Sequence, residues 1–148
     1  MASLKETSLT NAWNDEHIKG KSNANNCSGF IHSVLKESGV TIPTDLTADR
    51  LVDYFDNTPT FKTLGTGSEG LKEAFVNAKA GKIVIVGAKS SDLGAIHGHV
   101  ALIMGKGDSV NPYIYGGSIG KAQSRGTKTL SQIFRKAYFP KLKYFLAP

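Results

Sequence analysis

A single cysteine and four histidines are the residues of this sequence best suited to nucleophilic chemistry. Cys27 is the only cysteine, and Ser28 and Gly29 follow it. Apolar residues at helical spacing begin at Phe30, so the thiol is expected in the first turn of a helix, on its buried side. The N–H groups and partial positive charge of a helix start favour a thiolate with a lowered pKa. The pattern predicts a nucleophile; the alternative is a buried cysteine that is only a small hydrophobic residue.

The neighbours of the cysteine indicate how a substrate would reach it. Asn26 is a suitable N-cap for the helix, and Gly39 is a suitable stop. The small residues after the thiol leave the helix start open, and the backbone N–H groups of Cys27 and Ser28 can face a developing oxyanion. Ser28 is therefore a supporting candidate.

A cysteine nucleophile needs a base, and two of the four histidines are suitable. His32 points away from the cysteine side of its helix, and His17 lies in a region without a pattern, where a surface position is expected. His97 and His99 flank the start of an apolar strand. His99 belongs to the strand and is held by the sheet, whereas His97 lies in the preceding loop. His99 is therefore the predicted base.

The surroundings of the predicted base suggest a cleft. His99 shares one face of its strand with Ala101 and Ile103. The thiol and the imidazole can therefore meet if the cysteine-bearing helix packs on this sheet. The loop 87–98 is rich in small polar residues and is a candidate cleft wall, or else an ordinary surface loop. A metal held by the two histidines of this region is an alternative, but no further acidic or histidine cluster completes such a site.

The periodicity of apolar residues predicts helices first and strands afterwards. From residue 82 onward the helical period gives way to that of strands. A capping box between Thr129 and Gln132 marks a late helix. This order predicts an α+β fold, with N-terminal helices packed on a central antiparallel sheet. The predicted helices are 8–18, from Cys27 to Gly39, between Leu46 and Pro59, from Ser68 to Gly81 and one from Thr129; the predicted strands are 83–86, 99–104, 112–115 and one around 142–146.

Length and composition describe a basic protein of one domain. Residues 1–148 fit a single catalytic domain, with 40% hydrophobic and 20% charged residues. No apolar run approaches a membrane span, and the first residues do not resemble a Sec signal peptide. One cysteine excludes an internal disulfide and a multi-cysteine zinc site. The formal charge of +6 favours a polyanionic partner, but a merely soluble basic surface explains it equally well.

Two glycine motifs match known patterns without their structural context. The run 65–70 fits the dinucleotide pattern G-x-G-x-x-G, but only a weak strand precedes it, so a turn and a helix cap are predicted. The run 116–120 fits the G-x-S-x-G serine elbow, but no histidine follows His99, as that architecture requires. A glycine-rich turn that can line a cleft is predicted there.

Three motifs taken together resemble a known family. They are the runs 26–30 (Asn-Cys-Ser-Gly-Phe), 98–103 (Gly-His-Val-Ala-Leu-Ile) and 116–120 (Gly-Gly-Ser-Ile-Gly). In order and spacing they are similar to the type VI secretion amidase effectors, which belong to the NlpC-type, papain-like cysteine peptidases. The similarity extends roughly from Trp13 to Tyr144.

The resemblance implies a fold, a reaction and site residues. It implies a papain-like, NlpC-type fold in which Cys27 is the nucleophile and His99 is the base. Relatives draw a third, orienting group from the following strand, where Gly116 can offer only its carbonyl. Asn26 stands where the wider superfamily often has Asp, and the extra cysteines that some relatives pair are absent. The implied reaction is amide hydrolysis through a thioester, without a cofactor or metal.

The resemblance also implies a biological setting. Such enzymes cut stem or crosslink peptides of Gram-negative peptidoglycan, and the implied bond joins γ-D-glutamate to meso-diaminopimelate. They are made in the cytoplasm without a Sec signal and delivered by the type VI secretion apparatus to the periplasm of a rival cell. Kin cells carry a cognate immunity protein. We therefore expect a monomeric antibacterial toxin. Its expected partners are the peptidoglycan peptide, the type VI secretion apparatus and the cognate immunity protein, with no nucleic acid and no membrane.

Two other functions fit the same residues. A non-catalytic nucleic-acid-binding module would use interleaved basic and aromatic residues, namely Arg135, Lys136, Tyr138, Phe139, Lys141, Lys143 and Tyr144. An intracellular cysteine hydrolase with another amide substrate would use the same Cys27 and His99.

Overall fold

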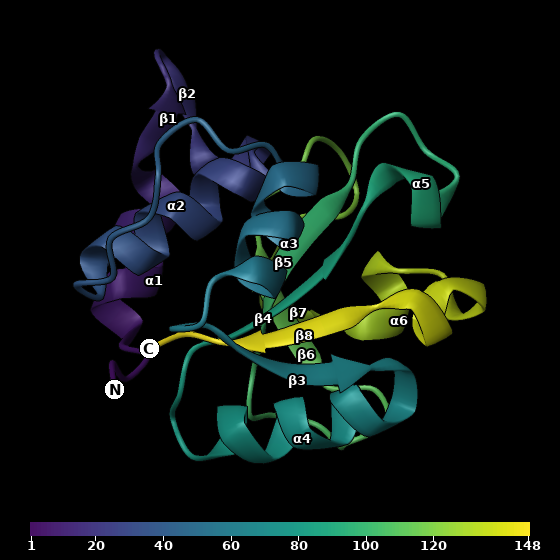
Figure 1. The fold of residues 1–148 in the computed structure, drawn as a ribbon. Helices are drawn as coiled ribbons and strands as arrows, with labels where there is room; N and C mark the ends of the chain where they lie inside the picture. The colour runs from purple at the N-terminus through teal and green to yellow at the C-terminus, as the bar shows by residue number, and fades with distance from the viewer.

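A six-stranded antiparallel sheet lies at the centre of the protein (Figure 1). The computed structural model describes residues 1–148. The strand order is β3-β8-β4-β5-β6-β7, and every neighbouring pair is antiparallel. The predicted α+β class is confirmed. The strands are β3 (Lys62–Thr66), β4 (Val84–Ala88), β5 (His99–Ile103), β6 (Tyr113–Gly116), β7 (Ser124–Thr129) and β8 (Lys143–Leu146).

Helices cover both faces of this sheet. In Figure 1, α1 (Glu6–Asn14), α2 (Cys27–Glu37) and α3 (Ala48–Asn57) lie above it, and α4 (Gly67–Lys79) lies below. No helix has both the length and the apolar character needed to cross a membrane. The shorter elements are β1 (Glu16–Ile18), β2 (Lys21–Ser22), α5 (Ser90–Leu93), α6 (Leu130–Ile133) and the 3-10 helices η1 (Asn23–Asn25) and η2 (Lys136–Lys141).

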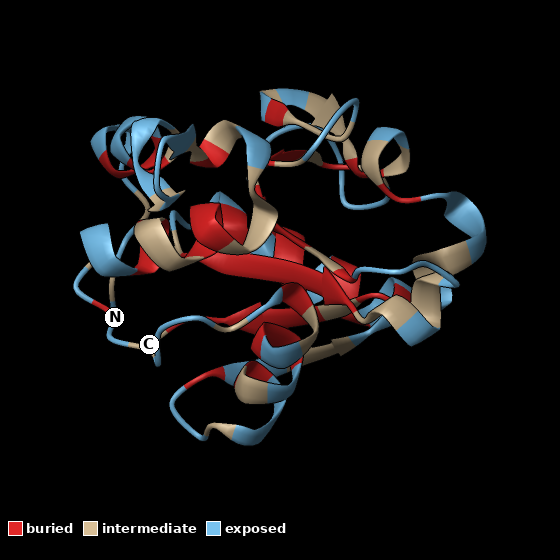
Figure 2. Cartoon of the chain, turned by 90° about the horizontal axis from the view of Figure 1, so that it is seen from above, coloured by how far each residue is buried: buried red, intermediate tan, exposed pale blue.

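The core consists of two apolar layers because side chains alternate along the strands. On β5, Val100 and Leu102 face the layer formed with α1, α2 and α3. Ala101 and Ile103 face the opposite layer, formed with α4. Buried residues are concentrated in the middle strands and on the helix sides that face them (Figure 2). Strand β4 is buried along its whole length, as its continuous apolar run predicts.

Helix α2 begins and ends where the sequence predicts. The side chain of Asn26 accepts a hydrogen bond from the Gly29 N–H at 2.9 Å, which is an N-cap. The helix ends at Glu37, and Gly39 follows with a φ of 77°, a conformation that glycine adopts without strain. Its buried residues are Gly29, Phe30, Ile31, Val34 and Leu35.

Some local structure differs from the prediction. The segment 8–18 was expected to be one helix, but α1 ends at Asn14 and the β1–β2 hairpin follows, with His17 half-buried in it. Strand β7 was not expected, because its sequence is polar and it is an edge strand with little burial. The helix at Thr129 is only the four residues of α6, although its predicted capping box with Gln132 is present.

The glycines at 65–70 allow two backbones to approach closely. Strand β3 runs directly into α4 and pairs antiparallel with β8, so no βαβ unit exists here. A Cβ on Gly70 would collide with the backbone of Gly65. The dinucleotide reading is therefore excluded by the topology.

The last strand of the chain lies inside the sheet. Strand β8 pairs with β3 on one side and with β4 on the other. The first residues lie beside it, because the Ala2 N–H donates to the Pro148 carbonyl at 3.2 Å, and the two ends are neighbours in Figure 1.

Candidate active site

Cys27 is the first residue of α2 and contacts the start of β5. It is half-buried at the border of the core layer that contains Val100. Backbone groups of Val100, Ser28 and Cys27 itself are placed to hydrogen-bond the thiolate. The first N–H groups of a helix have no partner within it, so this end of α2 can hold a negative charge.

Burial raises the pKa of the Cys27 thiol above its ordinary value, although backbone hydrogen bonds from Val100, Ser28 and Cys27 oppose the shift. Loss of solvent disfavours the charged thiolate more than these groups favour it. The predicted lowered pKa is therefore wrong. The thiol keeps its proton at neutral pH and needs a base when it attacks.

His99 is the first residue of β5 and is mostly surrounded by apolar groups. Its ring packs against Phe134, with ring centroids 5.2 Å apart and planes at 58°. Its Nε2 is buried and has no hydrogen-bond partner. Burial lowers the pKa of His99 to about 4. The imidazole is therefore neutral at neutral pH, which is the form that accepts a proton.

The two candidate residues lie at adjoining points of the fold without a hydrogen bond between them. The Cys27 thiol contacts the backbone of Val100, the residue after His99. Helix α2 packs on the face of Val100 and Leu102, whereas the His99 ring packs on Phe134 in the opposite layer. Helix α2 therefore lies on this sheet, but on the face opposite the His99 ring. Contact between thiol and imidazole has to be made around the end of β5.

A cavity of about 350 Å³ lies beside His99. Part of its wall comes from the loop 87–98, which the sequence suggested for this role, and part from the segment 133–138. A larger hollow of about 600 Å³ beside α2 includes His17 and His32 but neither candidate catalytic residue, so size does not identify the site. The smaller cavity is lined by Leu93, Gly94, Ala95, His99, Ile133, Phe134, Arg135 and Tyr138.

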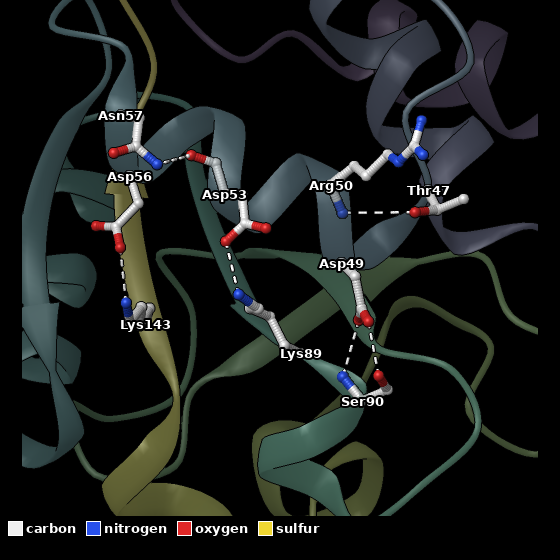
Figure 3. A network of polar contacts seen from close by, with 9 residues as sticks. All are labelled: Thr47, Asp49, Arg50, Asp53, Asp56, Asn57, Lys89, Ser90 and Lys143. Atoms are coloured by element: carbon white, nitrogen blue, oxygen red, sulfur yellow. Dashed lines mark hydrogen bonds and ion pairs between the residues drawn. The ribbon is translucent and has the colours of Figure 1, made fainter.

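A carboxylate on α3 contacts the loop 87–98 at two points. Asp49 accepts hydrogen bonds from the Ser90 N–H at 2.8 Å and from the Ser90 hydroxyl at 2.6 Å (Figure 3). A Cβ on Gly98 would collide with Asp49 Oδ1 and with the Ala88 carbonyl, so only glycine fits there. Burial alone would raise the pKa of Asp49, but the hydrogen bonds from Ser90, the charge of Lys89 and the Gly98 backbone lower it.

Two ion pairs extend this network along α3. Asp53 pairs with Lys89 at 2.7 Å, and Asp56 pairs with Lys143 of β8 at 2.7 Å (Figure 3). Both pairs are partly exposed, so each contributes little to stability.

The two supporting candidates have different surroundings. The Ser28 hydroxyl donates to Asn26 Oδ1 at 3.1 Å, so its side chain braces the N-cap. Gly116 ends β6 and packs closely on Ala101, where an added Cβ would lie 3.0 Å from the Ala101 Cβ. No hydrogen bond joins the Gly116 carbonyl to the His99 ring, whose Nε2 has no partner.

Asn23 is a buried residue of this region that the sequence analysis did not single out. Its Nδ2 donates to the Ala12 carbonyl at 3.0 Å and lies 2.8 Å from the Ser33 hydroxyl, and its Oδ1 accepts from the His17 N–H at 3.1 Å. It therefore joins α1, β1 and α2 behind the N-cap. An asparagine within the polar run 20–26 gives no local signal of burial.

The glycine turn after β6 closes on the same region. The Ser118 N–H donates to the Ala24 carbonyl at 2.9 Å. Gly117 packs so closely on the Asn23 carbonyl that a side chain would collide with it. The turn therefore fixes η1, just before the cysteine, and does not form a serine elbow.

The other histidines stand apart from the thiol. His17 and His32 stack with ring centroids 4.7 Å apart, and His32 Nε2 lies 3.0 Å from the Leu46 carbonyl. His17 is therefore not the simple surface residue that was expected. His97 is exposed in its loop. No group of three or more His, Cys, Asp or Glu side chains is arranged to hold a metal ion.

The residues proposed for a nucleic-acid module do not form one exposed surface. Tyr144 is 1% exposed and belongs to the core. Lys143 is paired with Asp56. A base-stacking platform needs exposed aromatic rings beside free cations, so these two residues cannot serve in it.

The sequence is similar to that of a known peptidoglycan amidase. No protein-family model matches the sequence. The chain is 33% identical over 141 residues to the peptidoglycan amidase Tse1 of Pseudomonas aeruginosa, and the alignment covers 92% of this chain and 84% of that protein. Identity at this level over nearly the whole of both chains establishes common ancestry, so the chain belongs to the family of the type VI secretion amidase effectors.

Proposed function

We propose that the protein is a cysteine amidase that hydrolyses the peptide part of peptidoglycan. The observation that carries this proposal is the position of Cys27, at the start of α2 against the residue that follows His99, in a relative of a peptidoglycan amidase. The imidazole of His99 is neutral at neutral pH, so its ring has a free position for the thiol proton.

The reaction follows from these protonation states. His99 takes the proton of Cys27 as the sulfur attacks the carbonyl carbon, and the oxyanion faces the N–H groups of Cys27 and Ser28. The protonated imidazole then gives its proton to the leaving amine, which departs and leaves a thioester. Water attacks the thioester with His99 as base, and the acid product and free thiol are released.

The substrate bond that we propose joins γ-D-glutamate to meso-diaminopimelate in the stem or crosslink peptide. Because the peptide continues through the γ-carboxyl of the glutamate, its α-carboxylate stays free and close to the reacting carbonyl. Arg135 lines the cavity beside His99 and makes no ion pair in the structure. An arginine without an ion pair in the lining of this cavity supports a substrate with such a carboxylate.

The biological role that we propose is that of an antibacterial toxin. Family membership supports delivery by the type VI secretion apparatus into the periplasm of a recipient cell, and a cognate immunity protein in the producing cell. The formal charge of +6 suits an anionic wall polymer. We propose that the enzyme acts there as a monomer.

Mass spectrometry of purified peptidoglycan digested with the protein tests the proposed reaction. We expect new fragments that end in a free γ-carboxyl of D-glutamate and begin with a free amine of diaminopimelate. The Cys27→Ala variant, prepared and assayed in parallel, should release none. New termini at another peptide bond would change the bond that we propose. An unchanged digest, from wild-type protein whose Cys27 still reacts with iodoacetamide, would reject peptidoglycan as the substrate.

A further inference from the structure

His99 lacks the direct polar support that usually orients a catalytic histidine. No hydrogen-bond partner reaches its buried Nε2. The ring is packed on Phe134, which limits its tilt but does not fix the backbone that carries it. The position of the imidazole therefore depends on the chain that leads into β5.

That chain is the segment 90–98, and Asp49 contacts it at both ends. At the first end, the carboxylate accepts two hydrogen bonds from Ser90, through the backbone N–H and the hydroxyl. At the other end, Oδ1 lies against Gly98, the residue before His99. One side chain on a rigid helix thus closes a nine-residue segment, and Figure 3 shows it between α3 and Ser90.

The same segment forms part of the cavity wall. Leu93, Gly94 and Ala95 line the cavity with His99. Gly94 has a φ of 58° and turns the chain after the short helix α5. A displacement of this segment would therefore move both the wall and the base.

We propose that Asp49 is a positioning residue, whose carboxylate fixes the segment 90–98 and thereby sets the place of the His99 imidazole. This inference rests on the proposed roles of Cys27 and His99. Asp53, one turn further along α3, holds only Lys89, outside the segment, and provides a matched control.

The test measures how fast Cys27 reacts with iodoacetamide across a pH series, because this rate needs a base near the thiol but no substrate. The variants are Asp49→Ala, Asp49→Asn, Ser90→Ala, Asp53→Ala and His99→Ala, and the double variant Asp49→Ala with His99→Ala. Hydrolysis of a soluble muropeptide and the thermal unfolding midpoint are measured on the same samples.

We expect Asp49→Ala to slow alkylation at neutral pH and to lower kcat on the order of 10- to 100-fold, since small misplacements of catalytic groups have effects of this size. Asp49→Asn and Ser90→Ala keep part of the contact between Asp49 and Ser90. Their alkylation rates and kcat values should therefore lie between those of Asp49→Ala and the wild type. Asp53→Ala should stay within about twofold of the wild type, because it breaks only an exposed pair.

The double variant separates positioning from general stability. If Asp49 acts through His99, Asp49→Ala has no further effect once His99 is alanine. The proposal would be overturned if the losses of alkylation rate in the double variant were additive. It would also be overturned if Cys27 in the Asp49→Ala and Asp49→Asn variants were alkylated at the wild-type rate. Should the wild type cleave no muropeptide while its alkylation still depends on both residues, the proposed function fails and the positioning role stands.

Discussion

The two candidate catalytic side chains are held in opposite ways. Cys27 begins a helix whose N-cap, Asn26, is hydrogen-bonded and braced by the hydroxyl of Ser28. Behind it, Asn23 ties α1, β1 and α2 together through its buried amide. His99, in contrast, has a buried nitrogen with no partner and rests on an aromatic ring.

This difference indicates where each property of the site originates. The thiol side gains its geometry from a dense set of polar contacts, both from residues close in sequence and from the turn after β6. The imidazole side gains its low pKa from burial and its position from a loop held across 41 residues by Asp49. A polar partner on His99 would raise its pKa, so the bare environment also keeps the base neutral.

Removal of the thiol should have the largest effect. Cys27→Ala should reduce hydrolysis about 10⁴-fold or more, because no other group on the thiol side can form the covalent intermediate. The unfolding midpoint should change little, since a methyl group suits the half-buried position. Cys27→Ser should be nearly as inactive. Initial rates on a muropeptide measure the effect, and a fully active alanine variant would end the proposed mechanism.

Loss of the imidazole should have the next largest effect. His99→Ala should lower kcat about 10²- to 10⁴-fold, the usual contribution of a general base. His97→Ala should retain most activity, since this exposed side chain lies in the loop. The reverse result would assign the base to the loop. Equal and severe losses with metal found by elemental analysis would favour a metal site instead.

The desolvation of the His99 imidazole, which has no polar partner, should also make the free energy of unfolding depend on pH. The pKa is about 4 in the folded protein, below the ordinary 6.5, so only the unfolded chain gains this proton between these values. The free energy of unfolding should therefore fall as pH drops from 6.5 to about 4, by on the order of 3 kcal/mol. Urea titrations of the wild type and His99→Gln in one pH series measure it. The glutamine variant should show a flatter profile, and parallel profiles would contradict the predicted burial effect.

The smallest effect should come from the N-cap of the thiol side. Asn26→Ala should cost about 1 kcal/mol of stability and slow hydrolysis several-fold, because it loosens the first turn that carries Cys27. Asp108→Ala removes the side chain that accepts hydrogen bonds from the Val110 and Asn111 N–H groups, in the loop after β5 and at the opposite end of that strand from His99, and is the matched control. It should cost a similar free energy without a similar loss of rate. Equal rate losses would show that the cap acts only through stability.

The features predicted from the sequence are those that depend on neighbouring residues. The cap at Asn26, the stop at Gly39 and the buried run of β4 follow from local chemistry, and the structure contains them. The antiparallel sheet follows from the order of helices and strands.

The features that were missed depend on contacts distant in sequence. Asp49 and Ser90 are 41 residues apart, and no local pattern links them. The raised pKa of Cys27 depends mainly on burial, which the helix-start argument does not include. The side of the sheet on which α2 packs is a third such feature, because periodicity identifies the buried side of a helix but not the strand face that covers it.

The interior position of β8 has a consequence for synthesis of the protein. Its residues leave the ribosome after every other strand, yet both of its neighbours in the sheet depend on it for hydrogen bonds. The pairing of β8 with β3 and β4 therefore has to wait until the end of the chain has been made, although the helical segments emerge earlier. The six-stranded sheet, and the placement of β3 in it, is therefore complete only after translation has passed residue 146.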